Sequence, residues 1–354
     1  MGAEEPALRV KLFRSARAFE TAAAETVLDA ALRAGLDVSH RCLGGNCGAC
    51  RARLLEGEVA YPNGRPLGLS DDETADGLVL LCRAHARSDL LLEIFAPGTE
   101  GALRVKRLPC RVERVERLGH DVMGVYLRLP PAESFEFKPG QYVDVVLSKG
   151  RRRSFSIASP PHDARPLELH VRRAPGGEFS EQVFADELRG AVLHLEGPLG
   201  NSVYRETSEA SPLLLVGGGT GLAPLKSILR HVLEQGVPRR MTLYWGVRAE
   251  RDLYAHAFLE EAARADPRFR YAPVLSEPSA AWKGRQGFVH EAVLAEVQGL
   301  GQHEIYASGP PQMIEAVRRD FMARGVAESA ISFDSFDYAP DSPARQSMRA
   351  ETRS

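Results

Sequence analysis

The 354-residue chain has few cysteines, almost no excess charge and no long apolar run, and each scarcity excludes a class of protein. Five cysteines are too few for a disulfide framework once a metal site is counted, which favours a reducing, cytoplasmic compartment. A formal net charge of -2 predicts neither a nucleic-acid nor an anionic-membrane partner. No segment approaches the roughly 18 apolar residues of a membrane span, and the N-terminus has no signal-peptide pattern. The length itself predicts two or three domains.

Four of the cysteines have the spacing of an iron–sulfur site. Three are close together in the stretch RCLGGNCGACR, at C-x4-C-x2-C spacing, and the fourth follows well downstream: Cys42, Cys47, Cys50 and Cys82. Thiolates are soft ligands that suit iron, and plant-type [2Fe–2S] sites combine this local spacing with a distant fourth cysteine. Intervening glycines allow a positive φ and bring N–H groups near the cluster sulfurs: Gly44, Gly45 and Gly48.

Two other interpretations of the cysteines are weaker. A zinc site usually needs a second close Cys/His pair, whereas Cys82 stands alone. Disulfides suit small secreted domains rather than a chain of this length. The fifth cysteine, Cys110, is expected to be a small buried apolar residue on a strand.

The first part of the chain, residues 1–97, combines strands, one helix and the cysteine loop. Residues 7–13 alternate as a strand does, and Val27 begins a helical pattern that Gly35 can end. Strands, a helix and a long metal-binding loop predict a small β-grasp-like module. This span resembles the plant-type ferredoxins, and the resemblance implies one [2Fe–2S] cluster. Residues 96–104 have the composition of a linker.

Residues 104–205 are dominated by short strands separated by turn signals, which predicts an antiparallel β-barrel or sandwich. Two stretches there could bind phosphate. The first is Arg153-Ser154-Phe155-Ser156, whose arginine can bind a pyrophosphate through two hydrogen bonds. The second is the turn Gly176–Ser180, which can open a helix whose N–H groups face a phosphate.

Residues 206–340 alternate strands and helices. A short apolar strand leads into Gly217-Gly218-Gly219-Thr220-Gly221, and a helix follows. Strand, glycine loop and helix form the geometry that places backbone N–H groups on a pyrophosphate. The βαβ rhythm predicts a Rossmann-like parallel sheet with the nucleotide at its carboxyl edge. The remaining residues, 341–354, are polar and are expected to be disordered.

Taken in order, these motifs resemble the ferredoxin–NADP reductase superfamily. The matching stretches are R-S-F-S, G-G-E-F-S, the G-P-L-G of residues 197–200, GGGTGLAP, YWGVRAERDLY, SGPPQM and FDSF. The resemblance implies FAD in the second domain. It assigns the pyrophosphate to Arg153, the flavin ring to Phe155 and a contact near flavin N5 to Ser156. It assigns FAD phosphate contacts to the glycine turn, at Gly176, Gly177 and Ser180.

In the third domain the resemblance implies a nicotinamide dinucleotide. Its pyrophosphate would be held by Gly219, Thr220 and Gly221, and its adenosine side by Gly246 and Arg248. Ser308, Gly309 and Pro310 would face the nicotinamide, and Phe336 would cover the flavin ring. The superfamily commonly has cysteine where this chain has Ser308. Glu277 follows the third strand of this domain and would repel a 2′-phosphate, which favours NADH over NADPH.

The whole chain resembles the NADH-dependent reductase components of multicomponent oxygenases. NADH gives two electrons as a hydride, an iron–sulfur cluster passes one at a time, and a flavin can do both. We therefore expect the order NADH, FAD, [2Fe–2S], oxygenase, with polar contacts from Ser156, Thr220 and Ser308 at the reacting ring. Two alternatives remain open from sequence. One is a reductase that serves a CDP-deoxysugar dehydratase, and the other is a non-enzymatic redox sensor.

Overall fold

The computed structural model describes residues 7–22, 25–36, 38, 45, 48–62, 64–66, 68–69, 71–94, 105–131, 133–148, 151–200, 202–206 and 211–336. Several expectations fall outside these residues. They concern Cys42, Cys47, Gly44, the linker 96–104 and the polar tail 341–354. The chain divides into two compact units, Met1–Ala102 and Leu103–Ser354, and each is described by itself.

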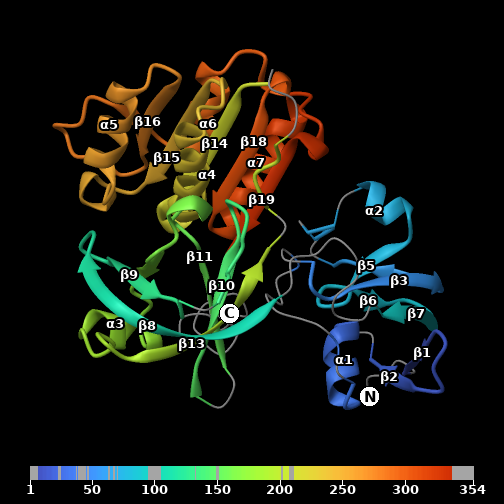
Figure 1. Cartoon of the computed structure of the whole chain (residues 1–354). Helices are drawn as coiled ribbons and strands as arrows, with labels where there is room; N and C mark the ends of the chain where they lie inside the picture. Colours follow the sequence, from blue (N-terminus) through green and yellow to red (C-terminus); the bar gives the residue numbers. More distant parts are fainter. Residues whose placement is uncertain are drawn as a thin grey trace. The chain divides into compact units, whose positions relative to one another are not determined.

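The first unit is built on a five-stranded sheet of order β2-β1-β7-β3-β5 (blue to cyan in Figure 1). Strands β1 and β7 are parallel, and the other neighbours are antiparallel. A second, two-stranded sheet pairs β4 with β6. The elements are β1 (Leu8–Leu12), β2 (Ala18–Thr21), α1 (Val27–Arg33), β3 (Arg51–Glu56), β4 (Val59–Ala60), α2 (Asp71–Ala75), β5 (Leu78–Leu80), β6 (His85–Ala86) and β7 (Leu90–Ile94).

Helix α1 begins and ends where its sequence predicts. The Thr26 side chain accepts a hydrogen bond from Asp29 N at 3.1 Å, which caps the first turn. Gly35 ends the helix with φ +71°, a conformation that suits glycine. The apolar face of the helix is fully buried in the core of this unit.

The two strands that flank Gly57 lie in different sheets. Gly57 has φ +94°, and a Cβ atom there would lie 2.1 Å from the carbonyl oxygen of Asp89. Only glycine fits such a close backbone approach. The chain therefore bends sharply after β3, and β4 pairs with β6 instead of folding back on β3.

The second unit begins with a six-stranded sheet that is antiparallel throughout, of order β11-β10-β13-β8-β9-β12. We call it the antiparallel sheet; its strands lie in the lower part of the unit in Figure 1. One buried apolar cluster forms its core. Its elements are β8 (Lys106–Arg117), β9 (Val122–Arg128), β10 (Tyr142–Val146), β11 (Arg152–Ser156), β12 (Leu167–Arg172), α3 (Glu178–Phe184) and β13 (Val192–Leu199).

A second six-stranded sheet follows, of order β17-β16-β15-β14-β18-β19, and all its strand pairs are parallel. We call it the parallel sheet. The strand order reverses between β14 and β18, so the carboxyl edge there is a topological switch point, where ligands bind in such folds. Its elements are β14 (Leu213–Gly218), α4 (Leu222–Glu234), β15 (Met241–Val247), α5 (His256–Ala265), β16 (Phe269–Leu275), β17 (Arg285–Gln286), α6 (Val289–Glu296), β18 (Glu304–Gly309), α7 (Pro311–Ala323) and β19 (Ile331–Ser335).

The helices bury the apolar side chains of the parallel sheet. Helix α4 packs on β14 and β18, while α6 and α7 contact each other and the sheet. Trp245, Tyr244 and Tyr306 are among the largest fully buried side chains. The longest described helices have 13 residues, and none of the described helices has the length and apolarity needed to cross a bilayer.

Candidate functional sites

The described cysteines of the first unit meet because two strands pair. Cys50 directly precedes β3, Cys82 follows β5, and Arg51 is paired with Leu80 across the two strands. The Cys82 backbone N–H lies 3.5 Å from Cys50 Sγ and donates a hydrogen bond to it. Both side chains are buried, at 3 % and 5 % exposure. Two buried sulfurs, one of them accepting a backbone N–H, are a donor set that fits an iron–sulfur cluster.

The loop around these cysteines needs its glycines. Gly45 and Gly48 have φ of +82° and +69°, as the sequence predicts. A Cβ atom on Gly45 would lie 2.6 Å from Pro66 Cβ and 2.7 Å from Arg83 Cγ, so the loop has no room for a side chain there. Burial, together with the negative charge of Cys50 and Cys82, raises the pKa of the Tyr61 hydroxyl to about 12. Tyr61 therefore stays neutral beside the cysteines and accepts a hydrogen bond from Leu80 N at 3.1 Å.

The two phosphate-type motifs of the antiparallel sheet lie side by side. Phe155 on β11 and Phe179 on α3 have ring centroids 5.3 Å apart. Arg151, which directly precedes β11, forms an ion pair with Glu178 at the start of α3. Residues separated widely in the sequence thus form one surface in which the arginines around β11 lie next to the glycine turn. That combination fits a bound pyrophosphate.

Within this surface, the predicted FAD residues have distinct surroundings. Arg153 Nη1 donates to the Arg152 carbonyl at 2.9 Å. Gly176 has φ +68°, and a Cβ atom on Gly177 would lie 2.8 Å from Ser180 Oγ. Ser180 Oγ is hydrogen-bonded to the backbone of Ala174 and Gly177, so it stabilises the turn itself.

Three side chains meet where the antiparallel and parallel sheets approach each other. Asp334 on β19 lies with Oδ2 3.1 Å from Ser308 Oγ and 3.4 Å from Ser156 Oγ. Each serine hydroxyl donates to the same carboxylate oxygen. Ser156 and Ser308 were predicted from separate motifs, and the structure brings them together through Asp334, which the sequence did not single out. Phe336 follows two residues later, and its N–H donates to Gly309 O at 3.3 Å.

A cavity of about 650 Å³ lies at the carboxyl edge of the parallel sheet. Several predicted dinucleotide residues line it: Gly219, Thr220, Gly246, Arg248 and Pro310. The size and the position at the switch point are those of a nucleotide site. Side chains from the antiparallel sheet complete the wall, at Asp121, Val122 and Arg172. Sequence reasoning missed this contribution because nothing in a strand sequence indicates which neighbouring sheet it faces.

The glycine loop under the cavity is shaped by close backbone contacts. A Cβ atom on Gly221 would lie 2.0 Å from the Ser308 carbonyl oxygen, and one on Gly218 would lie 2.5 Å from Met313 Sδ. Gly219 has φ +54°, and its carbonyl accepts a hydrogen bond from Trp245 Nε1 at 2.9 Å. These contacts leave no room for side chains at Gly218 and Gly221.

The charges at the cavity wall add a second carboxylate to the nucleotide argument. Glu277 is not among the described residues that line the cavity, although its N–H donates to the Arg248 carbonyl at 2.8 Å. Asp252 does line it, and Asp252 Oδ2 accepts a hydrogen bond from Ala249 N at 2.9 Å. A carboxylate at the wall repels an added phosphate, so Asp252 joins Glu277 as a residue that disfavours NADPH.

The fold and these sites define a redox protein that combines an iron–sulfur unit with flavin-type and dinucleotide-type domains. Family models agree with each part. Residues 10–87 match the 2Fe-2S iron-sulfur cluster binding domain, residues 109–204 the oxidoreductase FAD-binding domain, and residues 215–319 the oxidoreductase NAD-binding domain. The chain belongs to the family of ferredoxin-reductase-type oxidoreductases that carry [2Fe–2S], FAD and NAD-binding domains in one polypeptide.

Relatives match nearly the whole chain. The CDP-6-deoxy-L-threo-D-glycero-4-hexulose-3-dehydrase reductase of Yersinia pestis is 35 % identical over 329 residues, which cover 93 % of this chain and 98 % of the relative. Reductase component 2 of the terephthalate 1,2-dioxygenase of Comamonas sp is 34 % identical, covering 91 % and 95 %. Among solved structures, the Amycolatopsis cytochrome P450 reductase GcoB has 34 % identity and a TM-score of 0.68, covering 93 % and 98 %.

Proposed function

We propose that this protein is the reductase component of a multicomponent oxygenase, taking electrons from NADH and delivering them to an oxygenase on another chain. One observation carries the part of the proposal that concerns electron transfer from NADH. Ser156 of the antiparallel sheet and Ser308 of the parallel sheet share one carboxylate oxygen of Asp334. The flavin-type and dinucleotide-type domains therefore meet at a polar point beside the nucleotide cavity, where a nicotinamide and a flavin ring would face each other.

The cofactors bring the electron chemistry, and the chain positions them. When bound, FAD would supply the conversion between two-electron hydride chemistry and the one-electron chemistry of an iron–sulfur cluster. We assign the cluster ligands to Cys42, Cys47, Cys50 and Cys82. Arg153, Phe155, Gly176, Gly177 and Ser180 are assigned to FAD. Gly219, Thr220, Gly221, Gly246, Arg248, Gly309 and Pro310 are assigned to the nicotinamide dinucleotide.

The serine pair has a positional role. Because Asp334 accepts from both hydroxyls, each serine oxygen keeps lone pairs that can accept a hydrogen bond from a ligand. Neutral hydroxyls can then contact the carboxamide and ring edges without a proton transfer. We assign Thr220 a further polar contact with the reacting ring. We assign Phe336 the role of covering the flavin ring. Hydride transfer needs this alignment more than it needs an acid or a base.

The proposal also assigns a domain type to each part of the chain. We assign residues 1–97 to a β-grasp ferredoxin domain, 104–205 to an antiparallel β-barrel FAD domain, 206–340 to a Rossmann-like NAD domain and 341–354 to a disordered tail. A cytoplasmic location fits the low cysteine count, since iron ligands rather than disulfides account for four of the five.

The experiment compares two buried cysteines. Cys82→Ser is expected to abolish NADH-to-cytochrome c reduction and the low-temperature EPR signal of the reduced cluster. It should spare NADH-to-ferricyanide turnover, which needs only the flavin. Cys110→Ser is the matched control, because Cys110 is equally buried but lies on β8, where Sγ contacts Leu193 O at 3.5 Å. Loss of ferricyanide turnover in a folded, FAD-loaded Cys82→Ser protein would contradict the order of carriers.

A second acceptor is favoured by a specific observation. The Yersinia pestis relative at 35 % identity is a reductase for a sugar dehydrase. We therefore keep a CDP-deoxysugar dehydratase as the alternative electron acceptor. Coupled turnover separates the two: the reductase is mixed with a terminal oxygenase or with a pyridoxamine-dependent dehydratase, and product is measured against NADH consumed. Coupling to the dehydratase alone would overturn the oxygenase proposal.

A further inference from the structure

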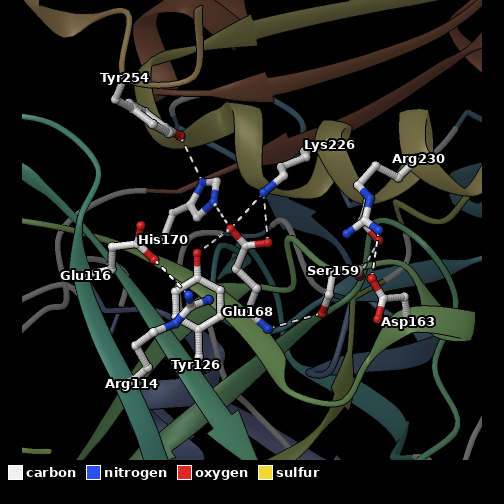
Figure 2. Close-up of polar contacts among 11 residues, drawn as sticks. Arg114, Glu116, Tyr126, Ser159, Asp163, Glu168, His170, Lys226, Arg230 and Tyr254 are labelled. Atoms are coloured by element: carbon white, nitrogen blue, oxygen red, sulfur yellow. Dashed lines mark hydrogen bonds and ion pairs between the residues drawn. The ribbon is translucent and has the colours of Figure 1, made fainter. Parts of the chain in front are cut away.

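A buried polar cluster lies between the antiparallel sheet and helix α4 and contains none of the residues assigned to the cofactors. Glu168 and His170 stand two residues apart on β12, and both are buried, at 6 % and 5 % exposure. Lys226 on α4 reaches Glu168 with Nζ 2.7 Å and 2.8 Å from the two carboxylate oxygens. Figure 2 shows these side chains converging, with Tyr126 on one side and Tyr254 on the other.

The hydrogen bonds fix the state of His170. Its Nε2 lies 3.0 Å from Glu168 Oε1, and its Nδ1 lies 3.0 Å from the Tyr254 hydroxyl. Burial lowers the pKa of His170 more than the neighbouring carboxylate raises it, so the ring is neutral near pH 7. A carboxylate can only accept, so Nε2 carries the proton. Nδ1 is then an acceptor, and the Tyr254 hydroxyl must donate to it.

When His170 is neutral, the negative charge of Glu168 and the positive charge of Lys226 cancel. Burial by itself would raise the pKa of Glu168. The hydrogen bond from His170 and the charge of Lys226 outweigh burial, and the pKa falls to about 2. The Glu168 carboxylate and the Lys226 ammonium thus form an ion pair with no net charge. The His170 ring is hydrogen-bonded to both Glu168 and the Tyr254 hydroxyl, so it links the position of the ion pair to that of Tyr254. Ser227, the next residue on α4, adds a hydrogen bond to Ser159 O at 2.8 Å.

Tyr254 connects this cluster to the nucleotide cavity. Tyr254 lines the cavity, whereas Glu168, His170 and Lys226 are not among the described lining residues. The Tyr254 ring meets Trp245 edge-on, with centroids 5.1 Å apart. Trp245 Nε1 in turn donates a hydrogen bond to the Gly219 carbonyl of the glycine loop. A shift of Tyr254 therefore moves one wall of the cavity and the support of its glycine loop.

We propose that His170 is a positioning residue for the nucleotide site: through the Tyr254 hydroxyl it holds one wall of the cavity in place, and Glu168 and Lys226 hold His170. Affinity for the nicotinamide dinucleotide then depends on a cluster that does not line the cavity. The antiparallel sheet contributes to binding through this contact in addition to the residues it places at the wall. The proposal does not depend on which protein accepts the electrons.

The test uses two tyrosines of the same cluster. Tyr254→Phe removes only the hydroxyl group that donates a hydrogen bond to His170 Nδ1. Tyr126→Phe is the matched control, because its hydroxyl contacts Glu168 Oε1 at 3.4 Å and Tyr126 is not a described lining residue. The probe is NAD⁺, titrated calorimetrically into the FAD-loaded full chain. Tyr254→Phe is expected to raise Kd roughly three- to tenfold, the loss typical of one buried hydrogen bond. Tyr126→Phe should leave Kd unchanged.

Two further measurements separate positioning from general damage. KM for NADH should rise in Tyr254→Phe while kcat at saturation and FAD content stay the same, because the reacting end is untouched. His170→Leu should weaken NAD⁺ binding as Tyr254→Phe does. The double variant should have the same Kd as either single variant, because both substitutions remove the same hydrogen bond between His170 and Tyr254. His170→Asn, whose amide oxygen can accept near the Nδ1 position, should restore most of the affinity.

Several outcomes would overturn the proposal. They are an unchanged Kd in Tyr254→Phe, an equal loss in Tyr126→Phe, additive losses in the double variant, or a fall in kcat with KM unchanged. If His170→Leu does not fold, the comparison of the two tyrosine variants still decides, because each changes one hydroxyl and leaves the ring in place.

Discussion

Replacing Lys226 by methionine should destabilise the domains of the second unit that meet at α4. Lys226 and Glu168 are 15 % and 7 % exposed, so this is a buried ion pair. Removing one partner of such a pair costs about 3–5 kcal/mol, because the other charge stays buried without compensation. Glu168 keeps the hydrogen bonds from His170 and Tyr126, so we expect the lower end, about 3 kcal/mol.

Urea unfolding followed by tryptophan fluorescence measures this loss locally. The chain has two tryptophans; Trp245 lies in the core of the parallel sheet, and the partly buried Trp282 packs against that core. The midpoint should fall with little change in slope. As a control, Arg189→Met removes an exposed ion pair with Asp186, which typically contributes only about 0–1 kcal/mol.

A double variant tests the cause of the loss. Glu168→Gln combined with Lys226→Met leaves an amide that still accepts from His170 and carries no buried charge. It should therefore be more stable than Lys226→Met alone. The reasoning would be refuted if Lys226→Met lost no more than the Arg189 control, or if the double variant were the less stable of the two.

Three other predictions concern single side chains. Asp334→Ala removes the acceptor shared by two serine hydroxyls, and anaerobic stopped-flow reduction by NADH should slow roughly tenfold or more; an unchanged rate would contradict the serine alignment. Asp252→Asn should raise kcat/KM with NADPH several-fold and Glu277→Gln should raise it less, because of these two carboxylates Asp252 is the one that lines the cavity; the reverse result would assign the selectivity to Glu277. In ¹⁵N-histidine NMR, His170 should be the neutral Nε2–H tautomer with a midpoint below its usual 6.5, and a midpoint above 6.5 would contradict the assignment.

The sign of the His170 contribution to stability follows from its lowered pKa. The unfolded chain binds a proton near pH 6.5, and the folded protein resists it until lower pH. Folding stability from this group is therefore complete above pH 6.5 and is lost as the pH falls below that value. Thermal midpoints measured between pH 7 and pH 5 should fall more in the wild type than in His170→Asn.

Most elements of the fold could be predicted because their patterns are local. The alternation of strands and helices over residues 206–340 was predicted, and so was the helix that follows the glycine loop, which the structure shows as α4. The short strand β17 was missed, since two residues carry no periodicity. The separation of β3 and β4 into different sheets depends on the contact between Gly57 and Asp89, which lies far along the chain.

The burial of strand β12 could not be predicted from the sequence. Its residues, LELHVR, alternate apolar and polar side chains, a pattern typical of a strand with one face in water. The structure buries both faces, because α4 and Tyr254 cover Glu168 and His170. The residues that meet there are 58 and 84 positions apart in the sequence, and no local pattern encodes their contact. Asp334 was missed for the same reason.

The polar character of this interface bears on the chemistry of the protein. Contacts at α4 are directional: Lys226 with Glu168, Ser227 with Ser159 O, and Arg230 Nη2 with Asp163 at 2.7 Å. An apolar interface would tolerate sliding, whereas charged and hydrogen-bonded partners specify one orientation, at some cost in stability.

Orientation is what hydride transfer demands, because the reacting atoms must lie about 3–3.5 Å apart. Ser156 and Ser308 come from the two sheets that this interface joins, and they share one oxygen of Asp334. A helix α4 freed from Glu168 would let the sheets shift and would separate the two hydroxyls. Lys226→Met should therefore slow flavin reduction as well as lower stability. Because Lys226 is not among the described residues that line the cavity, a folded but slow variant would identify the interface, rather than the cavity, as the source of the alignment.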